Sequence, residues 1–79
     1  MKVIEVVGPG CANCRQVEKN VREAVVMAGV EADVRHVTDF RQIAAYGLLH
    51  TPGLIIDGKL VSTGRIPSAG TIAVWLEED

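Results

Sequence analysis

Residues 8–14 read Gly-Pro-Gly-Cys-Ala-Asn-Cys, and this stretch decides the fold. It follows an apolar, β-branched run at residues 3–7 and brings the chain's two cysteines, Cys11 and Cys14, to the start of a predicted helix. From Cys14 onward, apolar residues recur at the spacing of the buried stripe of an amphipathic helix: Val17, Val21, Ala24, Val25 and Ala28. Cys14 is therefore predicted to face the core.

Cys11 is predicted to lie one turn before Cys14, at the helix N-terminus. Backbone N–H groups without helical partners and the positive end of the helix dipole favour a thiolate at this position. Cα atoms three residues apart in a helix are separated by about 5 Å, which lies within the range of disulfides. The pattern predicts that the Cys11 sulfur is exposed and negatively charged. It predicts that the Cys14 sulfur is buried and close enough to form a disulfide with Cys11.

Length and composition narrow the class of protein. A chain of 79 residues with 48% apolar residues predicts a single domain over residues 1–79. No apolar run is long enough for a secretory signal or a membrane span, so we expect a cytoplasmic protein with no membrane partner. In a reducing compartment a C-x-x-C pair indicates catalysis or metal binding. A net charge of -2 and only 4% aromatic residues argue against nucleic-acid binding.

The remaining pattern predicts the order βαβαββα. The strand at 3–7 should be central, because it is apolar on both sides of the pleat apart from Glu5. The other predicted elements are a helix from about Ala12 to Gly29, an edge strand at 30–38, a short helix from Asp39 that ends before Gly47, a hairpin over 54–62 turning at Asp57-Gly58, and a last helix opening at Pro67-Ser68.

Together these features resemble the thioredoxin fold over essentially the whole chain. More narrowly, the chain resembles small archaeal and bacterial thioredoxin-like proteins, the redox-active disulfide or glutaredoxin-like members of the thioredoxin superfamily. The resemblance depends on four motifs: Gly8-x-Gly10-Cys11-x-Asn13-Cys14, Thr51-Pro52-Gly53-Leu54, Asp57-Gly58-Lys59 and Gly64-Arg65-x-Pro67-Ser68. It implies an α/β minimal thioredoxin fold, with a four-stranded mixed sheet and three helices packed on both faces.

The resemblance also implies a function, a thiol:disulfide oxidoreductase that reduces protein disulfides without a bound cofactor. Cys11 would attack the client disulfide and Cys14 would resolve the mixed disulfide. Pro52 would be cis and face the dithiol, and the Thr51 backbone would pair with an extended substrate segment. Gly10, Ala12 and Asn13 would complete the active-site surroundings. The implied partners are a thioredoxin-reductase-type electron donor and disulfide-containing clients, with the protein acting as a monomer.

The chain also departs from the family pattern. Gly10 stands where full-size thioredoxins have Trp, and Ala12-Asn13 replaces Gly-Pro, so their redox potential does not transfer. The buried Asp beneath the second cysteine is missing, which leaves Glu5 as the candidate proton acceptor. Arg15 is a nearby cation that could favour the Cys11 thiolate, or an ordinary solvated arginine. There is no Cys-Pro-Tyr-Cys, so glutathione binding is not implied.

Two other functions use the same motif. A carrier of Cu(I) or Zn(II) would also place C-x-x-C between a first strand and helix, but the ferredoxin-like fold of such carriers has the order βαββαβ. A redox-sensing binding module is the other alternative, and the sequence does not separate it from an enzyme. His36 and His50 do not match zinc-finger spacing with the cysteines, so no metal site is predicted, and His50 could border the active site.

Overall fold

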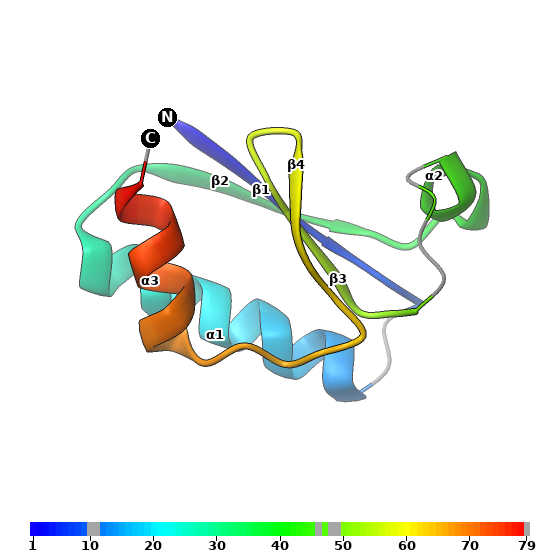
Figure 1. The fold of residues 1–79 in the computed structure, drawn as a ribbon, viewed down its shortest axis with the longest axis horizontal. Coiled ribbons are helices and arrows are strands. Elements are labelled where there is room, and N and C mark those ends of the chain that lie inside the picture. The colour runs from blue at the N-terminus through cyan, green and yellow to red at the C-terminus, as the bar shows by residue number, and fades with distance from the viewer. Residues whose placement is uncertain (10–11, 46, 48–49, 79) are drawn as a thin grey trace.

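The structure is a computed structural model that describes residues 1–9, 12–45, 47 and 50–78. Its elements follow one another in the predicted order βαβαββα (Figure 1). The strands are β1 (Lys2–Val7), β2 (Ala32–Val37), β3 (Gly53–Ile56) and β4 (Lys59–Thr63), and the helices are α1 (Ala12–Ala28), α2 (Phe40–Ala45) and α3 (Ala69–Glu77).

The four strands form one mixed sheet in the order β2-β1-β3-β4. β1 is parallel to β2 and antiparallel to β3, and β3 is antiparallel to β4. The apolar β1 thus lies inside the sheet, where both of its faces can be covered. The predicted central position of the first strand and the edge position of the second are confirmed.

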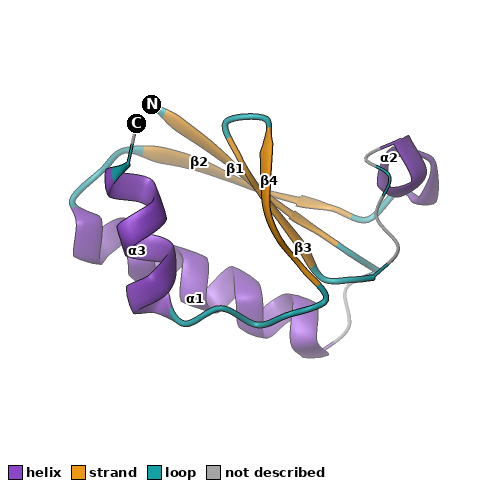
Figure 2. Ribbon diagram, viewed as in Figure 1, coloured by secondary structure: helices purple, strands orange, loops and turns teal. Residues whose placement is uncertain are grey.

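Helices α1 and α3 lie on the same face of the sheet and pack against each other (Figure 2). Their apolar stripes meet the inward side chains of β1 and β3 in one core, which contains Ile4, Val6, Val17, Val21, Leu54, Ile72 and Leu76. Full burial of a side chain of this size contributes about 1.5–3 kcal/mol. α3 begins at Ala69 rather than at Pro67-Ser68, because Ser68 is its N-cap and accepts a hydrogen bond from the Thr71 N–H.

Helix α2 contributes to the opposite face, at the end of the sheet where β2 finishes (Figure 1). Its Ile43 side chain is buried with Val7 of β1 and Ile55 of β3 in a second, smaller core. The Asp39 carboxylate accepts a hydrogen bond from the Arg41 N–H at 2.8 Å, as expected of a residue that caps a helix. The prediction of three helices on both faces is confirmed.

The β3–β4 hairpin turns at Asp57 and Gly58, where the sequence places it. Their φ angles are +49° and +82°, which lie in the left-handed region that this two-residue turn requires. The turn therefore uses the residue pair that adopts this backbone at least cost.

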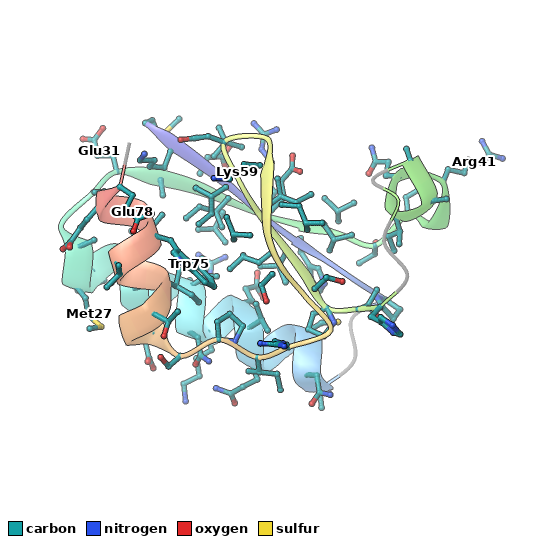
Figure 3. All side chains as sticks on the ribbon, viewed as in Figure 1. Met27, Glu31, Arg41, Lys59, Trp75 and Glu78 are labelled. Atoms are coloured by element: carbon teal, nitrogen blue, oxygen red, sulfur yellow. The ribbon has the colours of Figure 1, made fainter. Side chains whose placement is uncertain are left out.

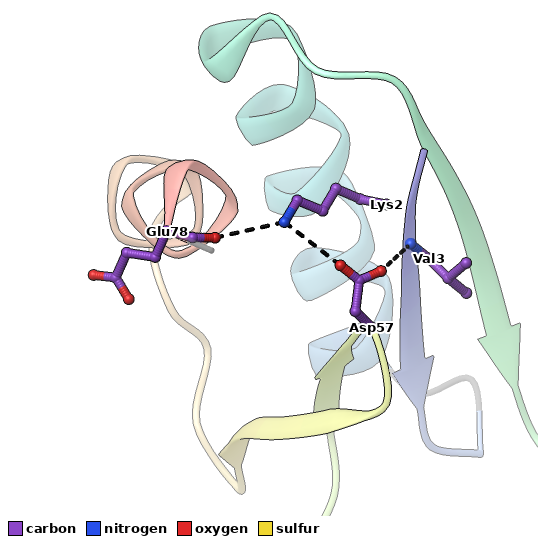
Figure 4. Close-up of polar contacts among 4 residues, drawn as sticks. All are labelled: Lys2, Val3, Asp57 and Glu78. Carbon is purple, nitrogen blue, oxygen red and sulfur yellow. Dashed lines mark hydrogen bonds and ion pairs between the residues drawn. The ribbon is translucent and has the colours of Figure 1, made fainter.

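The Asp57 side chain joins three segments at this end of the molecule (Figure 4). Its carboxylate accepts a hydrogen bond from the Val3 N–H at 2.8 Å and lies 3.5 Å from the Lys2 ammonium. That ammonium also donates to the Glu78 carbonyl at 3.5 Å. The Val3 hydrogen bond, helped by the charge of Lys2, holds the pKa of Asp57 below its ordinary value. The start of β1, the hairpin turn and the end of α3 are thus linked.

Candidate active site

The junction between β1 and α1 carries the C-x-x-C motif. Gly8 ends the pairing of β1 with β2 by donating its N–H to the Val37 carbonyl at 2.8 Å, and α1 begins at Ala12. Gly10 and Cys11 lie outside the described residues, so the exposure expected of the Cys11 sulfur stays a prediction. Ala12 and Asn13, the two residues between the cysteines of the motif, are exposed in the first turn of α1.

Cys14 is fully buried, as the helical phase predicts. Its sulfur lies directly against Gly8, and a Cβ atom added at Gly8 would overlap the Cys14 Sγ. The sequence reasoning did not assign this role to Gly8, although the glycine in the motif was the signal. Because Gly8 has only a hydrogen in place of a side chain, the Cys14 sulfur can lie beneath the end of β1.

The loop before β3 lies beside this sulfur. The Thr51–Pro52 peptide bond is cis, the geometry that the resemblance implied. Pro52 is buried and Thr51 is exposed, and the Thr51 Cβ would be 3.6 Å from a Cβ added at Gly8. Segments far apart in sequence, Gly8, Cys14 and Thr51, are therefore brought together.

A second loop, after β4, completes the surroundings of Thr51 and Pro52. The Gly64 N–H donates to the Pro52 carbonyl at 2.9 Å, and the Thr63 hydroxyl donates to the His50 carbonyl at 2.9 Å. Arg65 is exposed and directly follows Gly64, the residue that bonds to the Thr51–Pro52 loop. The sequence reasoning quoted Gly64 and Arg65 in a motif but gave them no role at the site.

Glu5 lies on the other face of the sheet from α1. Side chains alternate along a strand, and the neighbouring Ile4 and Val6 belong to the core that α1 covers. The strand partners of Glu5 are Arg35 in β2 and Ile55 in β3. Proton transfer between Glu5 and Cys14 would have to pass around β1, and the role of Glu5 as a proton acceptor stays a prediction.

The remaining predicted residues are spread around the site. Arg15 follows Cys14 directly and is exposed, while His50 is exposed and approaches Gly64. His36 lies in β2, where its Nε2 is buried and has no hydrogen-bond partner in the part of the chain that the structure describes. Within residues 1–9, 12–45, 47 and 50–78, no three His, Cys, Asp or Glu side chains gather as a metal site, and no helix is long and apolar enough to cross a membrane.

Taken as chemistry, the site is a C-x-x-C pair at a helix N-terminus, with its second sulfur buried and with two backbone loops beside it. In an α-helix, the Cα spacing of residues three apart suits both a dithiol and a disulfide, which is the chemistry expected of a C-x-x-C motif.

Comparison with known proteins finds relatives over nearly the whole chain. A family model described as "Thioredoxin domain" matches residues 2–77. A protein named Thioredoxin from Methanothermobacter thermautotrophicus is 44% identical over 68 residues, covering 86% of this chain and 88% of the relative. Another protein named Thioredoxin, from Methanocaldococcus jannaschii, is 40% identical over 72 residues, covering 91% of this chain and 83% of the relative.

Proposed function

The chain belongs to the thioredoxin domain family, and from this premise we propose that it is a thiol:disulfide oxidoreductase that reduces protein disulfides with Cys11 and Cys14. That it is a thioredoxin-like redox protein follows from the family. The dithiol mechanism and the direction of electron flow are the proposal.

The observation that carries the proposal is the burial of Cys14 against Gly8, beside Thr51. A sulfur in this position is shielded from client proteins, yet it belongs to a residue only three positions after Cys11 in the sequence. The buried cysteine is thus suited to an intramolecular step and Cys11 to the first attack on a client.

In the first step the Cys11 thiolate attacks one sulfur of a client disulfide. The client S–S bond breaks, a Cys11–client disulfide forms, and the released client thiolate takes up a proton. In the second step Cys14 loses its proton and attacks the Cys11 sulfur, which releases the second client thiolate. The client gains two electrons and two protons, and the protein is left with a Cys11–Cys14 disulfide.

Turnover then requires a two-electron donor that reduces this disulfide again, for which a thioredoxin-reductase-type partner is the proposed class. The Thr51 backbone is the proposed pairing surface for an extended client segment, with Pro52, Gly10, Ala12 and Asn13 around it. A proton acceptor for Cys14 is required, and Glu5 stays a candidate only through a path around β1. The cytoplasmic location also stays a prediction, since a reducing compartment would keep the dithiol ready.

The test is reduction of insulin disulfides by the wild-type protein, the Cys11→Ser variant and the Cys14→Ser variant. We expect both variants to lose turnover, and only Cys14→Ser to accumulate a covalent mixed disulfide, because it keeps the attacking sulfur but not the resolving one. An inactive wild type that binds Cu(I) or Zn(II) tightly at one ion per chain would replace the proposal with a metal carrier.

A further inference from the structure

Charged side chains are distributed unevenly between the two ends of the molecule. β1, β2 and β4 finish at the end that holds the dithiol, and α1 begins there. Figure 3 shows Arg41 at this end, and Glu31 and Glu78 at the opposite one. The exposed cations Arg15, Arg41 and Arg65 and the carboxylates of Glu18 and Asp39 belong to segments near the dithiol end. The carboxylates of Glu31, Asp57, Glu77 and Glu78 belong to segments at the opposite end, together with the cations Lys2 and Lys59.

The two carboxylates at the dithiol end already have partners. Asp39 caps α2 through the Arg41 N–H, and Glu18 lies 3.4 Å from the Arg22 guanidinium. Among the described residues, neither Arg15 nor Arg65 forms an ion pair. Arg15 and Arg65, the cationic rim of the site, therefore carry positive charge that no described carboxylate neutralises.

Arg65 is also one of the residues that line a groove on the surface. The groove has a volume of about 610 Å³ and runs between β4 and α3, with Leu60, Val61, Ile66 and Trp75 among its lining residues. β4 is an outer strand of the described sheet, so one row of its backbone N–H and C=O groups has no strand partner among the described residues. An extended peptide can pair with such an edge while its side chains reach apolar contacts.

From these observations we propose that the protein selects clients with an acidic, extended segment next to the disulfide. A client carboxylate would meet Arg65, with Arg15 adding to the positive field, and an apolar client side chain would rest against Ile66 and Trp75. The occupant is a disulfide-bearing protein of complementary charge, because the rim is cationic and lies beside Thr51. This inference rests on the proposed function, since it names the substrate class of the same site.

Attraction between exposed charges acts mainly on the rate of encounter and is weakened by salt. For one carboxylate near Arg65 we expect about a fivefold advantage over a lysine-bearing client at low ionic strength. The advantage should shrink to less than about twofold at 0.5 M salt, where the screening length is only about 4 Å.

The experiment uses two synthetic peptides with the same disulfide loop, one flanked by aspartates and the other by lysines. Second-order rate constants for reduction are measured with the wild type, Arg65→Glu, Arg65→Gln and Lys59→Glu, at 20 mM and 0.5 M salt. Lys59→Glu is the matched control, because it makes the same change of charge in an exposed residue at the hairpin turn, away from the dithiol. Thermal unfolding checks that all variants fold alike.

We expect the wild type and Lys59→Glu to prefer the aspartate peptide at low salt, Arg65→Gln to lose most of the preference, and Arg65→Glu to reverse it. Equal rates for both peptides with the wild type, or equal effects of Arg65→Glu and Lys59→Glu, would overturn the inference and leave the proposed function intact. Head-to-tail association abolished by Arg65→Glu would assign the surface to a second copy and overturn it as well. If the wild type reduces neither peptide and no insulin, the proposed function fails, and this inference fails with it.

Discussion

The two ends of the sheet are built in different ways. At the hairpin end, an exposed carboxylate joins three segments through polar contacts, as Asp57 does with Val3 and Lys2. At the dithiol end, the segments approach through glycines: Gly8 lies against the Cys14 sulfur, and Gly64 donates to Pro52 and packs on His50. Polar contacts in water tolerate small displacements, whereas close contacts at a glycine do not. Substitution should therefore affect the reactive end more severely than the hairpin end.

The largest effect is expected for Gly8→Ala. The new Cβ would overlap the Cys14 sulfur, so α1 or β1 would have to shift, at a cost of about 1–3 kcal/mol in the free energy of unfolding. We also expect the rate of insulin reduction to fall at least tenfold, because the Cys14 sulfur would be displaced from its position against residue 8. Urea unfolding and the insulin assay measure the two effects.

Gly70→Ala is the matched control for that substitution. Gly70 lies in the first turn of α3, where the nearest atom to an added Cβ is the Ser68 Oγ at 4.0 Å. Alanine should be neutral or stabilise the helix by up to about 1 kcal/mol. An equal loss of activity in Gly8→Ala and Gly70→Ala would show that the close contact between Gly8 and the Cys14 sulfur has no effect of its own.

Gly64→Ala should have the next largest effect. The substitution places a side chain at a φ of +69° and brings its Cβ to 2.9 Å from the His50 Cβ. Gly47→Ala is the control, since its φ is +71° but no atom of the described residues lies within 4 Å of an added Cβ. Both variants should lose about 1–2 kcal/mol from the strained backbone. Only Gly64→Ala should lose more and also slow client reduction. Identical losses would show that the His50 contact has no consequence.

A smaller effect is expected for Asn20→Ala, which tests the link between α1 and the loop before α3. The Asn20 amide donates to the Pro67 carbonyl at 3.0 Å in a partly buried position and accepts from Gln16 at 2.9 Å. Its loss should lower the free energy of unfolding by about 1 kcal/mol. Gln16→Ala, which removes only the exposed partner, should change stability by less than about 0.5 kcal/mol. A larger loss in Gln16→Ala would be inconsistent with this link.

The smallest effect concerns pH and the hairpin end. Because the pKa of Asp57 is lower in the folded chain than in the unfolded one, its ionised form favours folding. This contribution is present above the unfolded pKa of about 4 and is lost as the pH falls through the lower folded value. Asp57→Asn keeps an acceptor for the Val3 N–H and tolerates the positive φ. It should therefore be slightly less stable than the wild type at pH 7, where the Asp57 carboxylate is ionised, and the difference should disappear as the pH falls below about 4.

The control for the pH prediction is Asp33→Asn, which removes an exposed carboxylate paired with Arg35 at 2.7 Å on the edge strand β2. Chemical unfolding at several pH values between 2 and 7 compares the two variants with the wild type. A wild type and an Asp57→Asn variant with the same acid dependence would show that the link at the hairpin end does not depend on its charge.

Sequence reasoning predicted the elements well because each one carries a local signal. The apolar period after Cys14 marks α1, and the Asp57-Gly58 pair marks the hairpin turn. It erred by two residues at the start of α3, where Pro67 looked like a first helical residue and Ser68 proved to be the cap. At the site it predicted the burial of Cys14 and the cis bond before Pro52, but it gave no role to Gly8 or Arg65, because their surroundings come from neighbours distant in the chain.

The amino-acid sequence alone determined the order of elements, the buried phase of Cys14 and the family, because period, turn chemistry and motif spacing are properties of short segments. Only the tertiary structure decided that Gly8, Cys14 and Thr51 meet, that Glu5 points to the far face of β1, and that Gly64, the residue before Arg65, bonds to Pro52. The reason is physical. Strand order and side-chain alternation are settled when the sheet assembles, and it is the sheet that determines which distant residues share an end and a face.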